Sequence, residues 1–373
     1  MRAVVISNDV VPEQGGLVAA PGLRAHGLAV GLRTHGIEVT TVVVADAVDR
    51  YRRAVGPVSE AADVEIVPGS KLLRFLKSNR PVVAIMINGH QADHLHAARG
   101  VRIVYDGFAP RMLELAFRGG TYPEAALTGL ARLEGRAMRM ADALIVNGAR
   151  KVPYYLAALL QAGRDLRKVP TGVVEMAVPA EVAPDHPVGD PPLVALTGYR
   201  QDWNPPGPWV EVATEHLGTH FRALVVEGRH WGAGRAEVES LRWRALLEHP
   251  AVEVRPPLPW NEFSAVWREV DLAVDLFEQT PERELAMVTR SIVALGHGVP
   301  VVHPPFSEVS PLIARAGAGW LVDPADLDAV AAFFTGLDSA DIGAKRRGAR
   351  DLAGALLNPT AAVEPLVEIM REW

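Results

Sequence analysis

The 373-residue sequence contains no cysteine. Disulfide bonds, thiolate zinc sites and cysteine nucleophiles are therefore excluded. An excess of positive charge is also missing, because 38 lysine and arginine residues stand against 44 aspartate and glutamate residues, for a formal net charge of −6. Domains dedicated to nucleic-acid binding are normally basic, so we expect no nucleic-acid partner.

Long apolar segments are absent as well. The first apolar run, Arg2–Ser7, is interrupted by Asn8 and Asp9, and it predicts a first strand and not a signal peptide. No apolar span long enough for a transmembrane helix follows, so we expect a cytoplasmic protein and leave attachment to a membrane surface open. The apolar content of 49% is typical of a folded globular protein.

Strand and helix patterns alternate along the chain. A strand at 2–7, a loop with Gly15-Gly16, a helix at 17–35 and a strand at 37–44 form a βαβ unit, which predicts a parallel sheet. The pattern recurs up to Pro170, and a second series of the same kind begins at Leu193. The segment between the two series is rich in proline and predicts a linker.

The expected fold class is α/β, with two doubly wound, Rossmann-like domains that face a cleft. We predict a first domain over 1–174, a linker over 175–192, a second domain over 193–357 and a C-terminal helix over 358–373. Whether this helix crosses back to the first domain stays open. Ligands of such sheets bind at the carboxyl ends of the strands.

Polar residues follow the strands of the predicted first domain. Asn88 and His90 come after the strand at 81–87, and Asp106 follows the next strand, with Glu114 eight residues later. A carboxylate at a strand end can bind ligand hydroxyls or act as a base. The alternative for Asp106 is a helix cap. For His90 we favour a sugar-binding or pH-sensitive role over a metal site with His94 and His96, because no further ligand pattern is evident.

Gly15 and Gly16 offer backbone N–H groups between a strand and a helix, which could meet a phosphate or a sugar. The three-glycine fingerprint of dinucleotide binding is missing, so a nicotinamide site is not expected. The alternative is a flexible loop without a ligand.

The most informative stretch runs from Asp275 to Pro304. Its acidic turn precedes an apolar-periodic segment, which ends at glycines and is followed by a buried strand. The pattern predicts one helix that begins near Pro281. We expect acidic residues of the turn, Glu282 and Glu284, to bind ribose or sugar hydroxyls. The alternative is that they only complement the helix dipole.

Other donor-site candidates are positively charged or aromatic. Arg200 follows the first strand of the second domain, where a guanidinium can hold a diphosphate. Arg290 and Ser291 lie in the predicted helix and could take phosphate. Trp203 could stack on a base or sugar. Surface exposure of Arg200 and simple packing of Trp203 are the alternatives.

Four segments together resemble the retaining glycosyltransferases of the GT-B fold, a large family of bacterial polysaccharide and antibiotic enzymes. They are Gly15-Gly16 with LRAHGLAVGLRTHGIEVT, then DALIVNG at 142–148, then Gly198-Tyr199-Arg200, and finally PERELAMVTRSIVALGHGVPVV with GAGWLVDPADLDAV. The chain departs from the family at Val293, where a second glutamate is usual. It also lacks the lysine that commonly follows the arginine at the diphosphate.

The resemblance implies metal-independent transfer of a hexose, with retention, from a nucleotide-diphosphate sugar to a hydroxyl or amine. The nucleotide sugar is a co-substrate, and no further cofactor is expected. The acceptor would be a carbohydrate or an aminocyclitol-type natural product, in cell-surface glycan or natural-product biosynthesis. Alternatives are an epimerase or a pseudo-glycosyltransferase of the same fold, or an inactive nucleotide-sugar-binding partner.

The resemblance and the strand-end patterns together give a set of predicted site residues. Catalytic roles fall to Asp106, Arg200 and Glu282. Donor-binding roles fall to Gly15, Gly16, Arg200, Trp203, Glu282, Arg283, Glu284, Thr289, Arg290 and Ser291. Acceptor-binding roles fall to Asn88, His90, Asp106 and Glu114.

Overall fold

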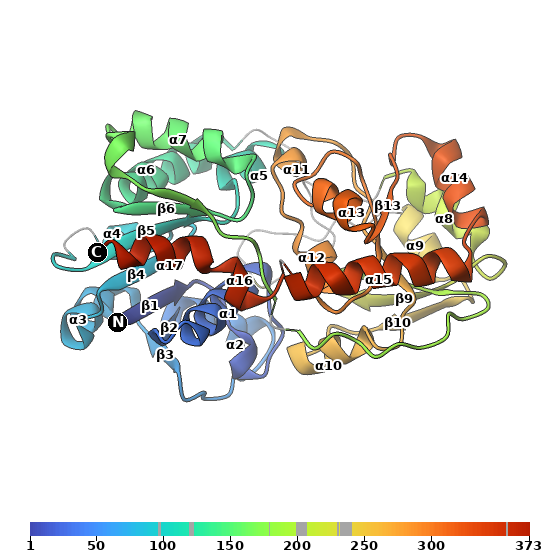
Figure 1. Cartoon of the computed structure of the whole chain (residues 1–373), viewed down its shortest axis with the longest axis horizontal. Helices are drawn as coiled ribbons and strands as arrows, with labels where there is room; N and C mark the ends of the chain where they lie inside the picture. The colour runs from blue at the N-terminus through green and yellow to red at the C-terminus, as the bar shows by residue number, and fades with distance from the viewer. Residues whose placement is uncertain are drawn as a thin grey trace. The chain divides into compact units, whose positions relative to one another are not determined.

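The computed structural model describes residues 1–95, 98–118, 123–178, 180–198, 207–229, 231, 241–355 and 357–373. They form two compact units, Met1–Pro179 together with Asn358–Trp373, and Ala180–Leu357 (Figure 1). The boundary after Pro179 lies inside the segment predicted as a linker, and the C-terminal residues belong to the first unit.

The first unit contains a seven-stranded parallel sheet in the order β3-β2-β1-β4-β5-β6-β7. The central strand β1 pairs with β2 in the register Arg2↔Glu38 and with β4 in the register Ala3↔Val83. The connections therefore run to opposite sides of β1, which makes the carboxyl ends of β1 and β4 a topological switch point. The strands are β1 (Arg2–Ser7), β2 (Glu38–Val44), β3 (Val64–Val67), β4 (Val83–Ile87), β5 (Arg102–Gly107), β6 (Ala143–Val146) and β7 (Thr171–Val173).

Helices cover both faces of this sheet. Alternate strand residues such as Val4, Ile6 and Met86 form a buried cluster with α3, α4, α6 and α7, as expected for the two-residue period of a strand. Near the C-terminus α16 lies beside α1 and α17 beside β7 (Figure 1). The helices are η1 (Pro12–Gln14), α1 (Ala20–Thr34), α2 (Ala45–Ala54), η2 (Gly69–Lys71), α3 (Leu72–Asn79), α4 (Ala92–Leu95), α5 (Arg111–Ala116), α6 (Glu124–Met140), α7 (Lys151–Gln161), η3 (Leu166–Lys168), α16 (Pro359–Ala362) and α17 (Glu364–Arg371).

The second unit contains a six-stranded parallel sheet in the order β10-β9-β8-β11-β12-β13. Its central strand β8 lies between β9 and β11, so a second switch point occurs at the carboxyl ends of β8 and β11. The strands are β8 (Leu193–Gly198), β9 (Arg222–Glu227), β10 (Val252–Arg255), β11 (Leu272–Val274), β12 (Val301–His303) and β13 (Gly319–Leu321).

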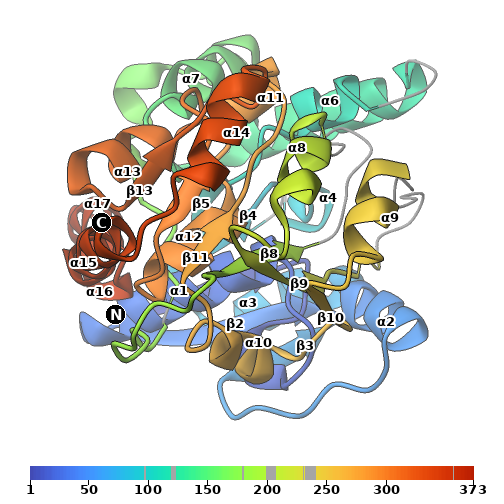
Figure 2. The ribbon, with the colours of Figure 1, turned by 90° about the vertical axis from the view of Figure 1, so that its right-hand side faces the viewer.

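One core of this unit lies between the sheet and three helices. Figure 2 shows α8, α9 and α14 on one side of β8 and β9, and α10 on the other. On the first side Phe221 stacks on Phe334 with ring centroids 4.7 Å apart. No helix within the described ranges is long and apolar enough to cross a membrane. The helices are α8 (Trp209–His216), α9 (Leu241–Leu247), α10 (Trp260–Val266), α11 (Pro281–Glu284), α12 (Thr289–Gly296), α13 (Ser310–Ala316), α14 (Leu327–Thr335) and α15 (Ser339–Ala355).

The single helix predicted from Pro281 onward is two short helices, α11 and α12. The Thr280 hydroxyl accepts a hydrogen bond from the Arg283 N–H at 3.1 Å and starts the first of them. Between them Val288 is extended, with φ of −65° and ψ of 106°, so the first helix does not continue into the second. The break lets α12 begin at the sheet edge.

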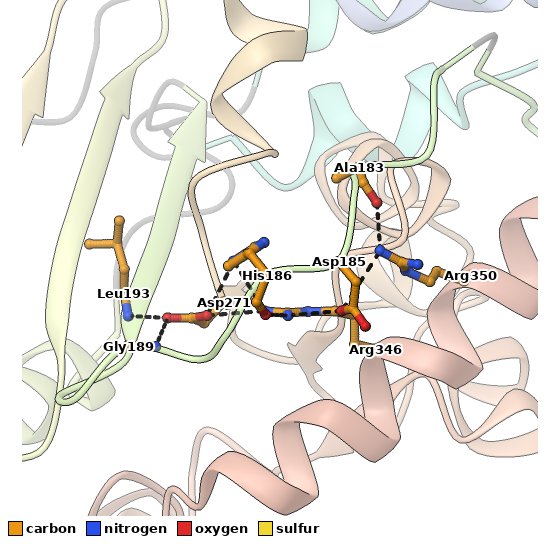
Figure 3. Close-up of polar contacts among 8 residues, drawn as sticks. All are labelled: Ala183, Asp185, His186, Gly189, Leu193, Asp271, Arg346 and Arg350. Atoms are coloured by element: carbon orange, nitrogen blue, oxygen red, sulfur yellow. Dashed lines mark hydrogen bonds and ion pairs between the residues drawn. The ribbon is translucent and has the colours of Figure 1, made fainter.

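Part of the proline-rich segment is fixed to the second unit, although the sequence predicts a linker there (Figure 3). The buried Asp271 carboxylate accepts hydrogen bonds from the N–H groups of Gly189 and Leu193, at 3.2 and 2.8 Å. Arg346 of α15 donates to the same carboxylate at 3.0 Å and to the His186 carbonyl at 2.6 Å. The segment before β8 is therefore anchored to α15 through a buried ion pair.

Candidate active site

The carboxyl edge of the second sheet brings Arg290 against the end of its central strand. β8 ends at Gly198, whose φ of 87° lies in the left-handed region that favours glycine. A Cβ at this position would lie 2.7 Å from Cδ of Arg290, so the arginine stem packs directly on the strand end. Thr289 and Arg290 are the first two residues of α12. The Arg290 side chain is 30% exposed and can be reached by a ligand.

Asp275 fixes the guanidinium from the end of β11. Its Oδ1 accepts from Nη2 of Arg290 at 2.8 Å, and its Oδ2 accepts from the Ser291 hydroxyl at 2.7 Å. The Asp275 side chain is 7% exposed. Because both oxygens are engaged by the protein, the carboxylate serves to orient Arg290.

Behind Ser291 the hydrogen bonds continue into the core. The Ser291 Oγ lies 2.9 Å from Nδ1 of His303, and Nε2 of His303 lies 2.5 Å from Oγ of Ser307. The Ser307 hydroxyl also accepts from the Val309 N–H at 3.1 Å. Since Ser291 is buried, its hydroxyl lies out of reach of a bound phosphate, in contrast to the role predicted for it from the sequence.

The charges of this edge are set by burial and by the neighbouring arginines. Burial raises the pKa of the Asp275 carboxyl, but Arg290, His303, the Ser291 hydrogen bond and Arg283 together outweigh it and hold the pKa below the usual value. Burial lowers the pKa of His303 to about 4, with both arginines acting in the same direction and Asp275 against them. Near neutral pH, Asp275 is therefore a carboxylate and His303 a neutral imidazole.

The acidic residues predicted to bind sugar hydroxyls are engaged within the protein. Glu282 is buried and accepts from Nη2 of Arg283 at 2.6 Å and from its Nε as well. The same guanidinium lies over the ring of Phe277, 5.4 Å from its centroid. Glu284 accepts from Nε2 of Gln279 at 2.7 Å. These contacts argue against a catalytic or ribose-binding role for Glu282, because its carboxylate is buried and already paired with the Arg283 guanidinium.

In the first unit, the end of β5 carries a buried ion pair. Asp106 is 0% exposed and Arg24 of α1 is 2% exposed. The guanidinium donates from Nε to Oδ2 at 2.8 Å and from Nη2 to Oδ1 at 3.1 Å, and its Nη1 donates to the carbonyls of Val174 and Glu175. The pair joins β5, α1 and the chain after β7. This geometry speaks against the predicted role of Asp106 as a base or an acceptor ligand.

The loop after β4 is positioned by Asn88. Its Oδ1 accepts from the Ala109 N–H at 2.9 Å, and its carbonyl accepts from Nη1 of Arg111 at 3.1 Å. Asn88 is itself buried, so it connects the loops after β4 and β5 and does not offer its amide to solvent. His90 and Glu114 are half-buried and keep part of their surface open.

A buried carboxyl group lies near this edge on α6. Glu134 is 7% exposed, and its Oε1 has no hydrogen-bond partner among the described residues. Burial raises its pKa to about 7; Glu114 adds to the shift and Arg111 opposes it. The hydroxyl of Tyr105 is likewise buried without a hydrogen-bond partner in the part of the chain that the structure describes. Glu134 therefore exchanges its proton near neutral pH.

The two N-terminal glycines differ in their surroundings. Gly15, with φ of 70°, ends η1 and is exposed. Gly16 is buried against Tyr51, whose hydroxyl oxygen would lie 2.3 Å from a Cβ at this position. The Leu17 N–H donates to that hydroxyl at 2.7 Å. The pair also precedes the start of α1 at Ala20, so it does not form the helix N-terminus that the sequence suggests.

Some predicted residues lie outside the described ranges, namely Arg200, Trp203 and His96. Conversely, sequence reasoning missed Asp275 and His303 as members of a site. A signal for Asp275 existed, because it directly follows the apolar residues of a buried strand. No such signal marks Arg24 or Glu134, whose roles depend on contacts distant in sequence.

Comparison with known proteins decides the fold. No protein-family model matches the chain, and no curated protein matches it in sequence. Sucrose-phosphate synthase from Thermosynechococcus elongatus superimposes with a TM-score of 0.65 at 16% identity, over 100% of this chain and 98% of the other. Anabaena HepE, solved with UDP-glucose, gives a TM-score of 0.65 at 14% identity, with both chains covered completely. The chain has the GT-B fold.

The GT-B fold is shared by proteins of different activities. A putative UDP-N-acetylglucosamine 2-epimerase from Listeria monocytogenes superimposes with a TM-score of 0.51 at 13% identity, over 100% of this chain and 96% of the other. The fold expected from the sequence is thereby confirmed. The chemistry has to be argued from the residues at the sheet edges.

Proposed function

We propose that this protein is a glycosyltransferase that moves a hexose from a nucleotide-diphosphate sugar to a hydroxyl or amine, with retention of the anomeric configuration and without a metal ion. In this proposal the second unit binds the donor and the first unit binds the acceptor, which is a carbohydrate or an aminocyclitol-type natural product.

One observation carries the proposal. Arg290 presents a partly exposed guanidinium beside the carboxyl end of β8, and Asp275 holds it there at 2.8 Å. This edge is the switch point of the second sheet, where ligands of doubly wound folds bind. An oriented guanidinium at such an edge suits a diphosphate, because it can form charge-assisted hydrogen bonds with phosphate oxygens. Solved structures of HepE, which share the fold, contain UDP or UDP-glucose.

The proposed reaction requires little from acidic side chains. The bond between the anomeric carbon and the phosphate oxygen breaks, and the acceptor oxygen bonds to the same face of that carbon. The acceptor proton passes to an oxygen of the leaving diphosphate. Negative charge accumulates on this group in the transition state, and the fixed Arg290 guanidinium would stabilise it. Arg200 is the proposed second cation. This scheme agrees with the burial of Asp106 and Glu282.

Nucleotide binding tests the proposal. We expect calorimetry with UDP, GDP, ADP and dTDP to detect at least one ligand, and Arg290→Gln to weaken its binding by about tenfold or more, the usual value of a charged hydrogen bond. Arg315→Gln at the exposed end of α13 is the matched control and should bind normally. Equal affinity of wild type and Arg290→Gln for every nucleotide would refute the donor-site assignment.

The epimerase neighbour supports one alternative, in which the protein rearranges the nucleotide sugar itself. Incubation of a bound nucleotide sugar without an acceptor separates the two activities. A transferase releases the nucleoside diphosphate and needs an acceptor for rapid release. An epimerase instead produces an isomeric nucleotide sugar. Binding without either product would identify an inactive partner.

A further inference from the structure

We propose that Ser291 and His303 are positioning residues, which act through Asp275 to hold Arg290 in place for the donor diphosphate. The inference rests on the proposed function and adds residues that do not touch the ligand themselves.

The first step is the restraint on Arg290. Its guanidinium contacts one oxygen of Asp275, while its stem is confined by the backbone of Gly198. A long arginine side chain loses much rotamer freedom when it binds a ligand, and this loss reduces affinity. A carboxylate that already orients the guanidinium lowers that cost. The orientation of Asp275 therefore matters for binding at this edge.

The second step fixes Asp275 itself. Ser291 has one hydroxyl proton, and the 2.7 Å contact with Oδ2 of Asp275 uses it, because a carboxylate can only accept. The 2.9 Å contact between Ser291 and His303 must then have Nδ1–H of His303 as the donor. The second oxygen of Asp275 is thus held by a hydroxyl that is itself oriented by the imidazole.

The third step anchors His303. With the proton on Nδ1, its Nε2 is an acceptor and receives the Ser307 hydroxyl at 2.5 Å. The Ser310 hydroxyl donates to the Pro304 carbonyl at 2.7 Å and fixes the loop that carries Ser307. Each group in the series donates a hydrogen bond to the next: Ser307 to His303, His303 to Ser291, and Ser291 to Asp275. The neutral state of His303, favoured by its burial, is the state that this series requires.

Histidine variants can test the direction of the hydrogen bonds. His303→Asn can place an amide N–H near the position of Nδ1, whereas His303→Gln places its amide near Nε2. We expect Ser291→Ala and His303→Gln to raise the Kd for the nucleoside diphosphate identified among UDP, GDP, ADP and dTDP by about threefold to tenfold, the range for a lost hydrogen bond. His303→Asn should retain more of the wild-type affinity than His303→Gln.

A matched control comes from the same unit. Ser264 and His297 form a similar, partly buried contact of 2.6 Å that does not lead to Arg290, so Ser264→Ala should leave the Kd unchanged. The corresponding nucleoside monophosphate serves as a second probe. Its Kd should change less than that of the diphosphate, whereas general loss of structure would weaken both ligands and would also lower the melting temperature.

The outcomes separate the two proposals. If Arg290→Gln binds every nucleoside diphosphate as tightly as the wild type does, the donor-site assignment is refuted, and so is the positioning role that depends on it. If Arg290→Gln is impaired while Ser291→Ala and His303→Gln are not, only the positioning role is overturned. Equal weakening of monophosphate and diphosphate binding would also overturn it, because the effect would then be structural.

Discussion

The two units should respond to acid in opposite directions. In the first unit, burial raises the pKa of Glu134 from 4.5 to about 7, so the folded state binds more protons than the unfolded chain between these values. In the second unit, burial lowers the pKa of His297 and of His303 from 6.5 to about 4, so the folded state binds fewer protons. As the pH falls, the first unit therefore gains stability and the second loses it.

The pKa values set the size of the effect. Between about pH 7 and about pH 5, proton linkage gives the first unit a gain of about 2 kcal/mol from Glu134. Over the same range each buried histidine of the second unit costs about 2 kcal/mol, and the two together cost about 4 kcal/mol. In His297, Nδ1 donates to the Val293 carbonyl at 2.8 Å and Nε2 lies 2.6 Å from the Ser264 hydroxyl, so the opposing cost of protonation comes chiefly from burial.

The sequence provides separate probes for the two units. Seven of the eight tryptophan positions belong to Ala180–Leu357, so urea unfolding followed by tryptophan fluorescence reports mainly on the second unit. Hydrogen exchange of the β1 and β4 amides reports on the first unit. Glu134→Gln is the control, because it should abolish the acid gain of the first unit and leave the second unchanged. If the unfolding free energy of both units falls equally as the pH falls, and Glu134→Gln behaves as the wild type does, the predicted opposite response is refuted.

Two buried ion pairs give further predictions. Asp106→Ala should lower the unfolding free energy of the first unit by about 3–5 kcal/mol, because it leaves the Arg24 charge buried without its partner. In urea unfolding, the double variant Asp106→Leu/Arg24→Met should lose less stability than the single variant. Normal stability with lost turnover would instead return Asp106 to the catalytic site. Arg346→Met should destabilise the second unit by a similar amount through Asp271 and should speed proteolysis near His186, and unchanged proteolysis would contradict the anchoring role.

Much of the fold follows from local patterns. The strand predicted at 2–7 agrees with the structure, because its apolar residues 3–6 are buried and the polar Asn8 and Asp9 mark its end. The helix α2 is mostly polar, with only Ala47, Val48 and Tyr51 buried, and it follows β2 without a loop, so the sequence marks it poorly. The first series is expected to end at Pro170, but its last strand lies at 171–173, because Asp165 caps a short 3-10 turn just before it.

The sequence indicates where the candidate site lies, but not how its residues are paired. Polar residues after strand ends predict a ligand-binding edge, and the structure places Arg290 beside the end of β8. Whether such a group faces solvent depends on partners far away in the sequence. Arg24 reaches Asp106 across 82 positions, and no local pattern predicts that contact. Arg283 pairs with its own neighbour Glu282, although adjacent residues of a helix do not normally face each other.

The division of the chain has a consequence for its synthesis. Asn358–Trp373 belongs to the first unit, where the Pro359 carbonyl lies against Gly31 of α1 and Ile369 lies over Gly172 of β7. A ribosome releases these residues only after it has made the whole of Ala180–Leu357. The first unit therefore begins to form first, yet its α1 and β7 surfaces stay uncovered until the second unit has emerged. A nascent chain arrested before Asn358 would expose that apolar surface, and it would be the species most in need of a chaperone.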